Sequence, residues 1–528
     1  FQRMRKFAES ESPYRAATRG RARKIIPTRA ESLFTRAQKE AKGLDEDDDI
    51  ALMLKSKNFE QVSEVPKRLG VVFTRAERKK GRRRQLYWPK QLNDEIHEQY
   101  GKQPIDLEDT VLHASNVQPG MVARCFDIEK SFLQMGLTPE VQKYHGFKYR
   151  GKYYVNCTAP MGEVWVPSFV HLILKILAFN EEEGVQSEPH IDNVRFLGRN
   201  GDSVNRAANS FLDNCARCNV ILNKEPTNEI HEIGDFLGTT NDYARGLVRM
   251  AEKTVNKLRD ESSVAMAPEA TIEGFRALFG VLFFASRVLR ISLAEFYGPV
   301  KFLRRRLHEV SKGMMKDTDR AKLWPCMRQD LERWIETALE NPWTNHLERR
   351  NGVELVLVTD ASTLGWGAVL YDERTGTAAA TGGKWIQKRS SNEINELEAW
   401  SVRNAAEAFE EQLNDPSLRH LLVLVDNTAT LHAYRKGSAQ AHLLNRAVRE
   451  GQKYLPDNVK VSIAYIDSKT NQSFADPISR GEKMKEELAS QLGDLGRRLG
   501  RTALNVAVPA HRVIDLPCRR SNLTSIPG

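Results

Sequence analysis

The spacing of hydrophobic and polar residues falls into three successive patterns along the chain, and each predicts a different kind of region. Between Val122 and Phe236, short apolar runs alternate with helical patterns, which is typical of an α+β domain. Residues 251–345 lose the strand-like runs and show helical periodicity, with the apolar stretch FRALFGVLFFASRVL as their core. From Val353 onward, strands and helices return in the order β-β-β-α-β-α-β-α. The sequence therefore predicts an α+β fold built from several domains.

Single runs within these regions predict individual elements. MVARCFDI and KYYVNC predict strands, VPSFVHLILKILAF predicts a buried helix, and HIDNVRFLG predicts a strand pair broken at Asp192–Asn193. Farther along, VELVLVTD, GWGAVLYD and GGKWIQ predict three successive strands. LLVLVDN and VSIAYID predict two more strands, which alternate with helices predicted for NELEAWSVRNAAEAFEEQL, AHLLNRAVREGQKYL and SFADPISR.

The two ends of the chain are more polar than the rest. The Arg-rich N-terminal region contains an acidic cluster at Asp45–Asp49, which predicts a partly disordered basic and acidic linker, with order beginning near Val65–Phe73. The last stretch is polar and punctuated by proline, which predicts a tail or linker. The predicted segments are, in chain order, 1–65, 66–240, 241–350, 351–481 and 482–528.

Four acidic residues in the last third of the chain stand at the ends of apolar strand-like runs or on helices that follow them. They are Asp360 in VTDAS, Glu398 in NELEAW, Asp426 in LVLVDNTAT and Asp476 in SFADPISR. A mixed sheet that gathered these carboxylates would hold two hard cations, Mg²⁺ or Mn²⁺. Two such ions activate a water and stabilise the leaving oxygen of a phosphodiester. Because buried carboxylates are costly unless cations neutralise them, we expect the site to be weakly organised without metal.

Charge and composition fit a protein that works on nucleic acid. The 528 residues are enough for about three or four domains, and the net charge is +10, with dense basic runs at Arg78–Arg84 and Lys301–Leu307. Beside phosphodiester chemistry, such runs favour contact with a nucleic-acid backbone. The six cysteines form no evident disulfide framework, which indicates a reducing intracellular compartment, cytoplasmic or nuclear. No apolar run reaches the roughly 18 residues that span a bilayer, so no membrane partner is expected.

The strand order together with the Asp, Glu, Asp, Asp series resembles a ribonuclease H domain. Over about Val353–Arg480, the sequence motifs are most similar to those of the ribonuclease H of retroelement reverse transcriptases of the DIRS type. These motifs are TDASTLGWGA, GGKW, INELE, VDN and YIDSKTNQSFADPISR. This resemblance implies that all four acids are metal ligands, that each active site takes two ions, and that the substrate is an RNA–DNA hybrid. One departure is the loop Asp467–Gln472, which lacks the His that many ribonucleases H carry there.

Residues 70–240 resemble the fingers and palm of a reverse transcriptase, and the resemblance continues weakly through a helical thumb to about Pro342. The matching segments are RRRQLYWPKQLN, CFDIEKSFLQMGL, PMGEVWVP, HIDN, ILNKE and FLG. The resemblance implies a right-hand polymerase fold followed by the ribonuclease H-like α/β domain with its mixed sheet. It also implies that Asp127 and Asp192 hold two ions between a primer 3′-OH and a deoxynucleoside triphosphate.

Further roles follow from the resemblance residue by residue. Phe132 stands where the family places an aromatic gate against the ribose 2′-OH, and Lys224 where a lysine protonates the leaving pyrophosphate. Arg84, Met161 and Gly162 fall in segments that contact the nucleotide. The residues expected to contact nucleic acid, from the resemblance or from the basic runs, are Arg82, Arg83, Phe236, Gly238, Arg304, Arg305 and Arg306.

The segment HIDN departs from the family, which carries Tyr-x-Asp-Asp at this place. His190 replaces the Tyr, and Asn193 replaces the second Asp of the catalytic pair. Asn offers a carbonyl oxygen without a charge, which predicts a lower metal affinity at the polymerase site.

The sequence predicts an RNA-directed DNA polymerase whose ribonuclease H degrades the RNA that has been copied. Its partners would be an RNA template, a DNA primer, the RNA–DNA hybrid, dNTPs and other proteins of the same retroelement. Two alternatives stay open. Asn193 and the unmatched N-terminal residues favour a domesticated or decayed reverse transcriptase that binds nucleic acid as a structural protein, whereas the complete acid set argues against it. The other alternative is a hybrid nuclease with an inactive palm.

Overall fold

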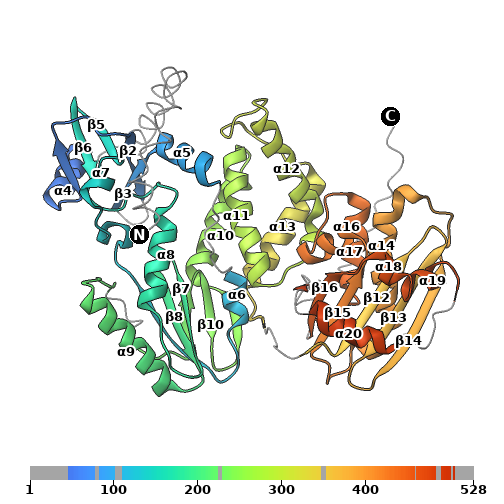
Figure 1. The fold of residues 1–528 in the computed structure, drawn as a ribbon. Coiled ribbons are helices and arrows are strands. Elements are labelled where there is room, and N and C mark those ends of the chain that lie inside the picture. The colour runs from blue at the N-terminus through green and yellow to red at the C-terminus, as the bar shows by residue number, and fades with distance from the viewer. Residues whose placement is uncertain are drawn as a thin grey trace. The chain divides into compact units, whose positions relative to one another are not determined.

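The computed structural model describes residues 46–77, 82–101, 110–223, 229–346, 352–457, 459–482, 489–500 and 503–505. These residues form two compact units. The first contains the described residues up to Gly101 together with Met121–Glu232, and the second contains Thr110–Gly120 and those from Ile233 onward. Helices and four sheets occur together, which confirms the predicted α+β class (Figure 1). The predicted segment boundaries remain predictions.

The first unit begins with a five-stranded sheet in the order β1-β6-β5-β2-β3. Its strands are β1 (Phe59–Val62), β2 (Leu69–Glu77), β3 (Arg82–Trp88), β5 (Gly146–Tyr149) and β6 (Lys152–Asn156). Helix α4 (Glu46–Lys55) packs on this sheet through Ile50, beside the buried ring of Phe59. The prediction that order begins near Val65 is therefore wrong, because β1 pairs with β6 and buries apolar side chains earlier in the chain.

A second sheet of the first unit has the order β4-β8-β7 and carries the upstream acids. Its strands are β4 (Val122–Asp127), β7 (Val185–His190) and β8 (Asn193–Gly198). The helices of this unit are α5 (Lys90–Tyr100), η2 (Ser131–Gln134), α7 (Pro139–Gln142), α8 (Val166–Leu177) and α9 (Gly201–Arg217). Helices α8 and α9 bury Leu174 and Phe211 against Phe126, Val194 and Phe196 of the sheet. The strands and the strand pair predicted for this region are confirmed, whereas the buried helix is only partly so, because α8 leaves Leu172 and Ile176 exposed.

The second unit opens with a short helix, a three-stranded sheet and a group of helices. These elements are α6 (Thr110–Ser115), β9 (Ile233–Phe236), β10 (Thr239–Asp242), β11 (Leu247–Met250), α10 (Glu252–Ala265), α11 (Ile272–Val288), η4 (Leu293–Phe296), α12 (Tyr297–Ser311) and α13 (Pro325–Glu340). The ring of Trp334 stacks on Phe296 with centroids 4.9 Å apart, and its Nε1 donates to Ser286 Oγ at 2.8 Å. The helical region predicted for residues 251–345 is confirmed.

The rest of the second unit is built on a six-stranded mixed sheet in the order β14-β13-β12-β15-β16-β17. Its strands are β12 (Leu355–Ala361), β13 (Gly365–Asp372), β14 (Thr377–Lys384), β15 (His420–Val425), β16 (Lys460–Tyr465) and β17 (Leu504–Asn505). Strands β12, β15 and β16 run parallel, and the remaining pairs are antiparallel. Leu355 and Leu357 face one apolar core, whereas Val356 and Val358 face another on the opposite side. The third predicted strand is displaced from GGKWIQ, because β14 already ends at Lys384.

Helices cover both faces of this sheet (Figure 1). They are η5 (Ser391–Glu393), α14 (Ile394–Ala408), α15 (Glu410–Leu413), α16 (Thr428–Lys436), α17 (His442–Gln452), α18 (Ser468–Asn471), α19 (Ala475–Ser479) and α20 (Ala489–Gly500). The tail predicted for 482–528 is wrong for α20 and β17, because Leu492 and Leu495 are buried against the sheet and β17 pairs with β16. None of the described helices is both long and apolar enough to cross a membrane.

Buried hydrogen bonds connect the helical region before the sheet to α17. Ser292 Oγ donates to Gln452 Oε1 at 2.7 Å, and Asn445 Nδ2 donates to the carbonyl oxygen of Ala294 at 2.9 Å. The side chains of Ser292, Asn445 and Gln452 are all buried. The short helix η4 is therefore fastened to the helix layer that covers the six-stranded sheet.

Candidate metal centre

Two neighbouring parallel strands bring Asp360 and Asp426 to the same edge of the six-stranded sheet. The register of β12 against β15 places Val358 level with Leu424, where the pairing ends, and each acid follows two residues later. Both acids therefore lie at the carboxyl ends of adjacent strands, which are spaced about 4.8 Å apart in a sheet. Every residue of β15 is buried, as expected for a central strand of a parallel set that is covered on both faces.

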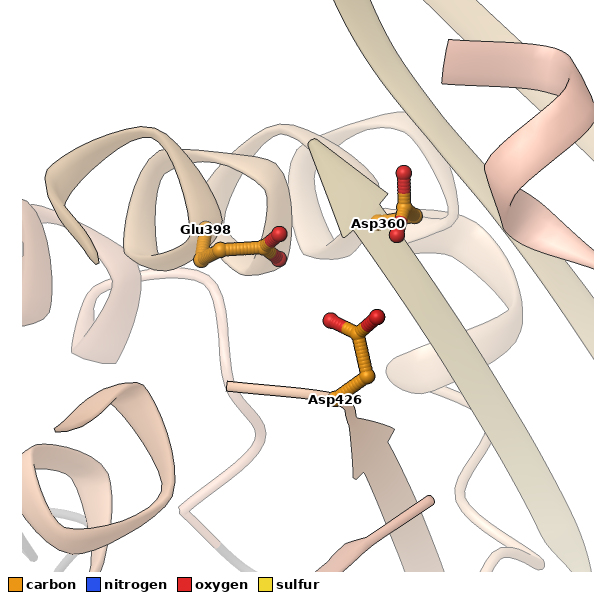
Figure 2. Close-up of side chains that lie close together, drawn as sticks. All are labelled: Asp360, Glu398 and Asp426. Atoms are coloured by element: carbon orange, nitrogen blue, oxygen red, sulfur yellow. The ribbon is translucent and has the colours of Figure 1, made fainter. Parts of the chain in front are cut away.

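Glu398 joins these two acids from helix α14, which packs on β12 and β13. The helix follows a capping box in which Ser390 and Glu393 satisfy each other's backbone N–H groups. One oxygen from each of Asp360, Glu398 and Asp426 lies within 4.8 Å of the others. Figure 2 shows the three carboxylates around a shared space. The structure thus brings together three of the four acids that the sequence predicts as ligands.

Burial makes this group costly to ionise. Loss of hydration, reinforced by the carboxylates of Asp360 and Asp426, raises the pKa of Glu398 to about 10. Loss of hydration also raises the pKa of Asp360 to about 6 and raises that of Asp426. Glu398 is 3% exposed, and its Oε2 is buried without a hydrogen-bond partner among the described residues. A divalent cation would satisfy this oxygen and neutralise the group, so the three acids could hold a metal ion.

Amide and hydroxyl groups orient the acids, and reasoning from the sequence missed them. Asn471 Nδ2 donates to Asp360 Oδ1 at 3.0 Å, and Ser479 Oγ donates to Asp360 Oδ2 at 2.6 Å. Hydrogen bonds from Ser468 and Asn471 to Asp426 oppose the rise that burial causes in its pKa. Protein groups thus help to orient Asp360 and Asp426, and the weak organisation of the site without metal stays a prediction. Two of these groups, on α18, come from the loop that lacks the His.

The fourth predicted acid, Asp476, stands apart from this group. It lies on α19 and is not among the acids whose oxygens fall within 4.8 Å of one another. Its charge still reaches them, because it helps to raise the pKa of both Asp360 and Glu398. Asp476 Oδ1 instead accepts two hydrogen bonds from Arg480, from Nε at 3.0 Å and from Nη2 at 2.7 Å. The role of Asp476 as a ligand remains a prediction.

A glycine lets α19 approach the sheet closely enough to take part. Gly367 of β13 pairs with Asp360 of β12. A Cβ at Gly367 would lie 2.5 Å from the carbonyl oxygen of Ala475 and 2.6 Å from the nitrogen of Ser479. Because backbone atoms cannot turn aside as a side chain can, any larger residue would displace α19. Both Asp476 and the hydroxyl that orients Asp360 would move with it.

The upstream acids meet across two strands of the smaller sheet. The register of β4 against β8 places Asp127 opposite Asn193, next to Asp192. Asn193 Nδ2 donates to Asp192 Oδ1 at 3.0 Å, so this amide serves as a donor to the neighbouring acid. Asn223 Nδ2 donates to Asp127 Oδ2 at 3.0 Å, a contact that reasoning from the sequence missed. The predicted ion-binding role of this pair stays a prediction.

The loop that carries Met161 and Gly162 is fastened to β3 and α5. Tyr87 donates its backbone N–H to the Met161 carbonyl at 2.9 Å. Asn93 holds the loop at two points, donating to the Gly162 carbonyl at 2.9 Å and accepting from the Val164 N–H at 3.0 Å. Gly162 has a φ of 118°, and a Cβ there would overlap the Tyr87 carbonyl oxygen, so only glycine fits. The two predicted nucleotide contacts therefore belong to a rigid loop.

Phe132, the predicted gate, lies in η2 and is half-buried. Its ring packs against a small apolar cluster formed by Ala159, Val166 and Val170. Ile191, from the turn between β7 and β8, packs on the same cluster. The ring thus has a fixed position beside the hairpin that carries the upstream acids, and its role as a gate stays a prediction.

The predicted basic contacts differ in their surroundings. Arg305 and Arg306 both pair with Glu309, at 3.3 and 2.9 Å, and Arg306 also lies over the ring of Phe302. Arg304 is exposed and forms no ion pair with a described residue. Arg304 is therefore the member of this basic run best placed to meet an external anion.

The other predicted contacts are only partly visible. Arg82, Arg83 and Arg84 belong to β3, but their side chains lie outside the described structure, as does Lys224. Phe236 is buried, with its ring edge-on to His113, so any contact of this residue with nucleic acid would come from its backbone. Gly238 follows β9 with a φ of 85°, and its carbonyl oxygen accepts from Thr254 Oγ1 at 2.9 Å.

The chain is similar in structure to solved structures of a foamy viral protease-reverse transcriptase. One complex with double-stranded DNA has a TM-score of 0.46 at 13% identity, covering 78% of this chain and 68% of that chain. A second has a TM-score of 0.47 at 13% identity, covering 82% and 83%. A complex with an RNA/DNA hybrid has a TM-score of 0.46 at 13% identity, covering 80% and 54%. No protein family and no curated protein matches the chain in sequence. Likenesses this distant carry no argument about activity.

Proposed function

We propose that the six-stranded sheet of the second unit and its covering helices form a ribonuclease H, which hydrolyses the RNA of RNA–DNA hybrids with two divalent ions. The observation that supports this proposal is the convergence of Asp360, Glu398 and Asp426 within 4.8 Å at one edge of a mixed sheet. Ligand sets made only of oxygen suit Mg²⁺ or Mn²⁺. The raised pKa of Glu398 indicates that this side chain would gain most from a nearby cation.

The residues of the chain have distinct tasks in such a reaction. Asp360 and Asp426 would hold the ions, in a position that Asn471 and Ser479 help to fix. Bound ions would lower the pKa of a water and neutralise the charge that develops on the leaving oxygen. Glu398 is buried and would add a third carboxylate to the ligands once a cation stabilised its ionised form. The A-like hybrid would be held through its phosphates and 2′-OH groups, without base recognition.

Replacing Asp426 by Asn tests this proposal. The change removes one charge from the centre of the group, so hybrid cleavage in Mg²⁺ should slow by several powers of ten. Asp415→Asn is the matched control, because Asp415 pairs with Arg374 at the surface of the same region. Full cleavage by Asp426→Asn, or cleavage that persists in EDTA, would contradict the proposal.

We also propose that the chain is an RNA-directed DNA polymerase of retroelement origin, most like those of the DIRS type. The observation that favours this second function is the position of Asp127 opposite Asn193 and beside Asp192. Residues 66–240 would form fingers and palm, 241–350 the thumb and connection, and 351–481 the ribonuclease H. The substrates would be an RNA template, a DNA primer and dNTPs, with other retroelement proteins as partners.

Primer extension on an RNA template, in Mg²⁺ and separately in Mn²⁺, tests the polymerase. Extension should disappear in Asp127→Asn and survive in Asp213→Asn, an exposed acid on α9 of the same unit. Absence of extension together with retained hybrid cleavage would leave a hybrid nuclease with an inactive palm. Hybrid binding without extension or cleavage would leave a structural nucleic-acid-binding protein.

A further inference from the structure

An arginine pairs with Asp476, and the reaction described above does not use it. Arg480 follows α19, one turn after Asp476, and directs both Nε and Nη2 to the same carboxylate oxygen. Its charge also reaches Asp360, whose pKa it lowers by attraction. The side chain of Arg480 is 56% exposed, whereas that of Asp476 is 19% exposed. A positive charge thus occupies Asp476, the one predicted metal ligand that lies outside the group of three acids.

We propose that Arg480 takes the place of a divalent ion at Asp476 until a phosphate of the hybrid draws it away. While Arg480 is in place, its two donors compete with any cation for Asp476, and its charge repels a second ion. The group formed by Asp360, Glu398 and Asp426 then binds one ion tightly. The second ion binds tightly only after Arg480 has moved. This inference rests on the proposed ribonuclease function and adds that the substrate controls how many ions the site holds.

The exchange is physically reasonable because only a side chain has to move. The backbone of α19 is held on the sheet at Gly367, whereas the guanidinium of Arg480 already reaches solvent. An ion pair that is half open to water holds its partners weakly. A phosphate offers two oxygens that match the guanidinium fork, so an arriving hybrid would be the better partner.

Metal binding without nucleic acid tests the first half of this inference. Mn²⁺ is titrated calorimetrically into the full chain and into Arg480→Gln, and heats that persist in Asp360→Asn are subtracted as binding elsewhere. We expect the second ion to bind at least about tenfold more tightly to Arg480→Gln, because a repelling charge next to the site is lost. Arg374→Gln is the control, since Arg374 pairs with Asp372 at the far end of β13, and it should change neither affinity.

Hybrid binding in EDTA tests the second half. The slope of log affinity against log salt should fall by about one in Arg480→Gln, because one phosphate contact is lost, and should not change in Arg374→Gln. An unchanged second-ion affinity, or an unchanged slope, would overturn the inference. Neither measurement needs cleavage. If both effects appear but the chain does not cleave the hybrid, the role of Arg480 stands and the proposed ribonuclease function is wrong. If the chain cleaves the hybrid but neither effect appears, only the role of Arg480 is wrong.

Discussion

Replacing Glu398 by Gln should stabilise the metal-free protein and abolish hybrid cleavage. The side chain is 3% exposed, and folding raises its pKa from 4.5 to about 10. At pH 7 the folded protein therefore keeps this carboxyl protonated, whereas the unfolded chain ionises it. The interval from 4.5 to 7, at about 1.36 kcal/mol per pH unit, makes this a penalty of about 3 kcal/mol. Gln carries no ionisable proton, so we expect a gain of about 1–3 kcal/mol in the free energy of unfolding.

The pH dependence of this gain has a definite sign. A carboxyl whose pKa is raised by folding contributes its full stability below its unfolded pKa of 4.5 and loses that contribution as the pH rises toward 10. In EDTA, the difference between Glu398→Gln and the parent should therefore be small at pH 5 and larger at pH 8. Urea unfolding measures it directly, and in a thermal scan it would correspond to roughly 2–10 °C.

Addition of Mg²⁺ should reverse the order of stability, because an ion that binds only the folded parent site stabilises it by mass action. Glu411→Gln is the matched control, since Glu411 is an exposed carboxyl in the same region, and its unfolding midpoint should not change. If Glu398→Gln is no more stable than the parent at pH 8 in EDTA, the inference that burial destabilises this carboxylate is refuted.

Three further predictions concern other candidate residues. Phe132→Ala should raise ribonucleotide use relative to dNTP use by about tenfold or more in single-nucleotide extension, because room opens for the 2′-OH; an unchanged ratio would contradict the gate. Asn193→Asp should restore a charge beside Asp192 and increase extension more in Mg²⁺ than in Mn²⁺, and equal gains in both metals would count against that account. Arg304→Ala should reduce the salt slope of hybrid binding by about one, whereas the already paired Arg306→Ala should leave it nearly constant; equal effects would place the contact elsewhere.

The acids of the second unit were predictable because they interrupt apolar runs that are easy to recognise. β12 and β15 are buried on both faces, so their sequences are almost continuously apolar up to Asp360 and Asp426. Glu398 does not end an apolar strand, and α14 also carries Glu396 and Glu407, so its local sequence separates it less clearly from its neighbours. Its place on a helix that follows a strand-like run made it a candidate, and the resemblance supported that choice.

The groups that orient these acids were not predictable in the same way. Asn471 and Ser479 reach Asp360 from more than 100 residues away in the chain, and such contacts depend on how elements pack and not on local pattern. The pairing of Asp476 with Arg480 could have been expected from their spacing of four residues. The closeness of this ion pair to the three acids could not. Similarly, α20 is held in place because Leu492 is buried in the core of the sheet. The surrounding sequence is mostly polar and therefore does not predict this packing.

The buried hydrogen bonds between η4 and α17 affect whether the six-stranded sheet and its helices can be separated from the rest of the chain. A fragment that begins at residue 352 would retain all the acids of the sheet, yet it would lose the bonds that Gln452 and Asn445 form with Ser292 and Ala294 and would expose a helix face that is covered in the whole chain. Each lost partner of a buried polar group costs about 1–3 kcal/mol when water does not replace it. A fragment that begins before Ser292 keeps both bonds. Recombination that transferred the sheet without η4 would therefore produce a less stable domain. We expect transfers that keep the domain stable to include η4.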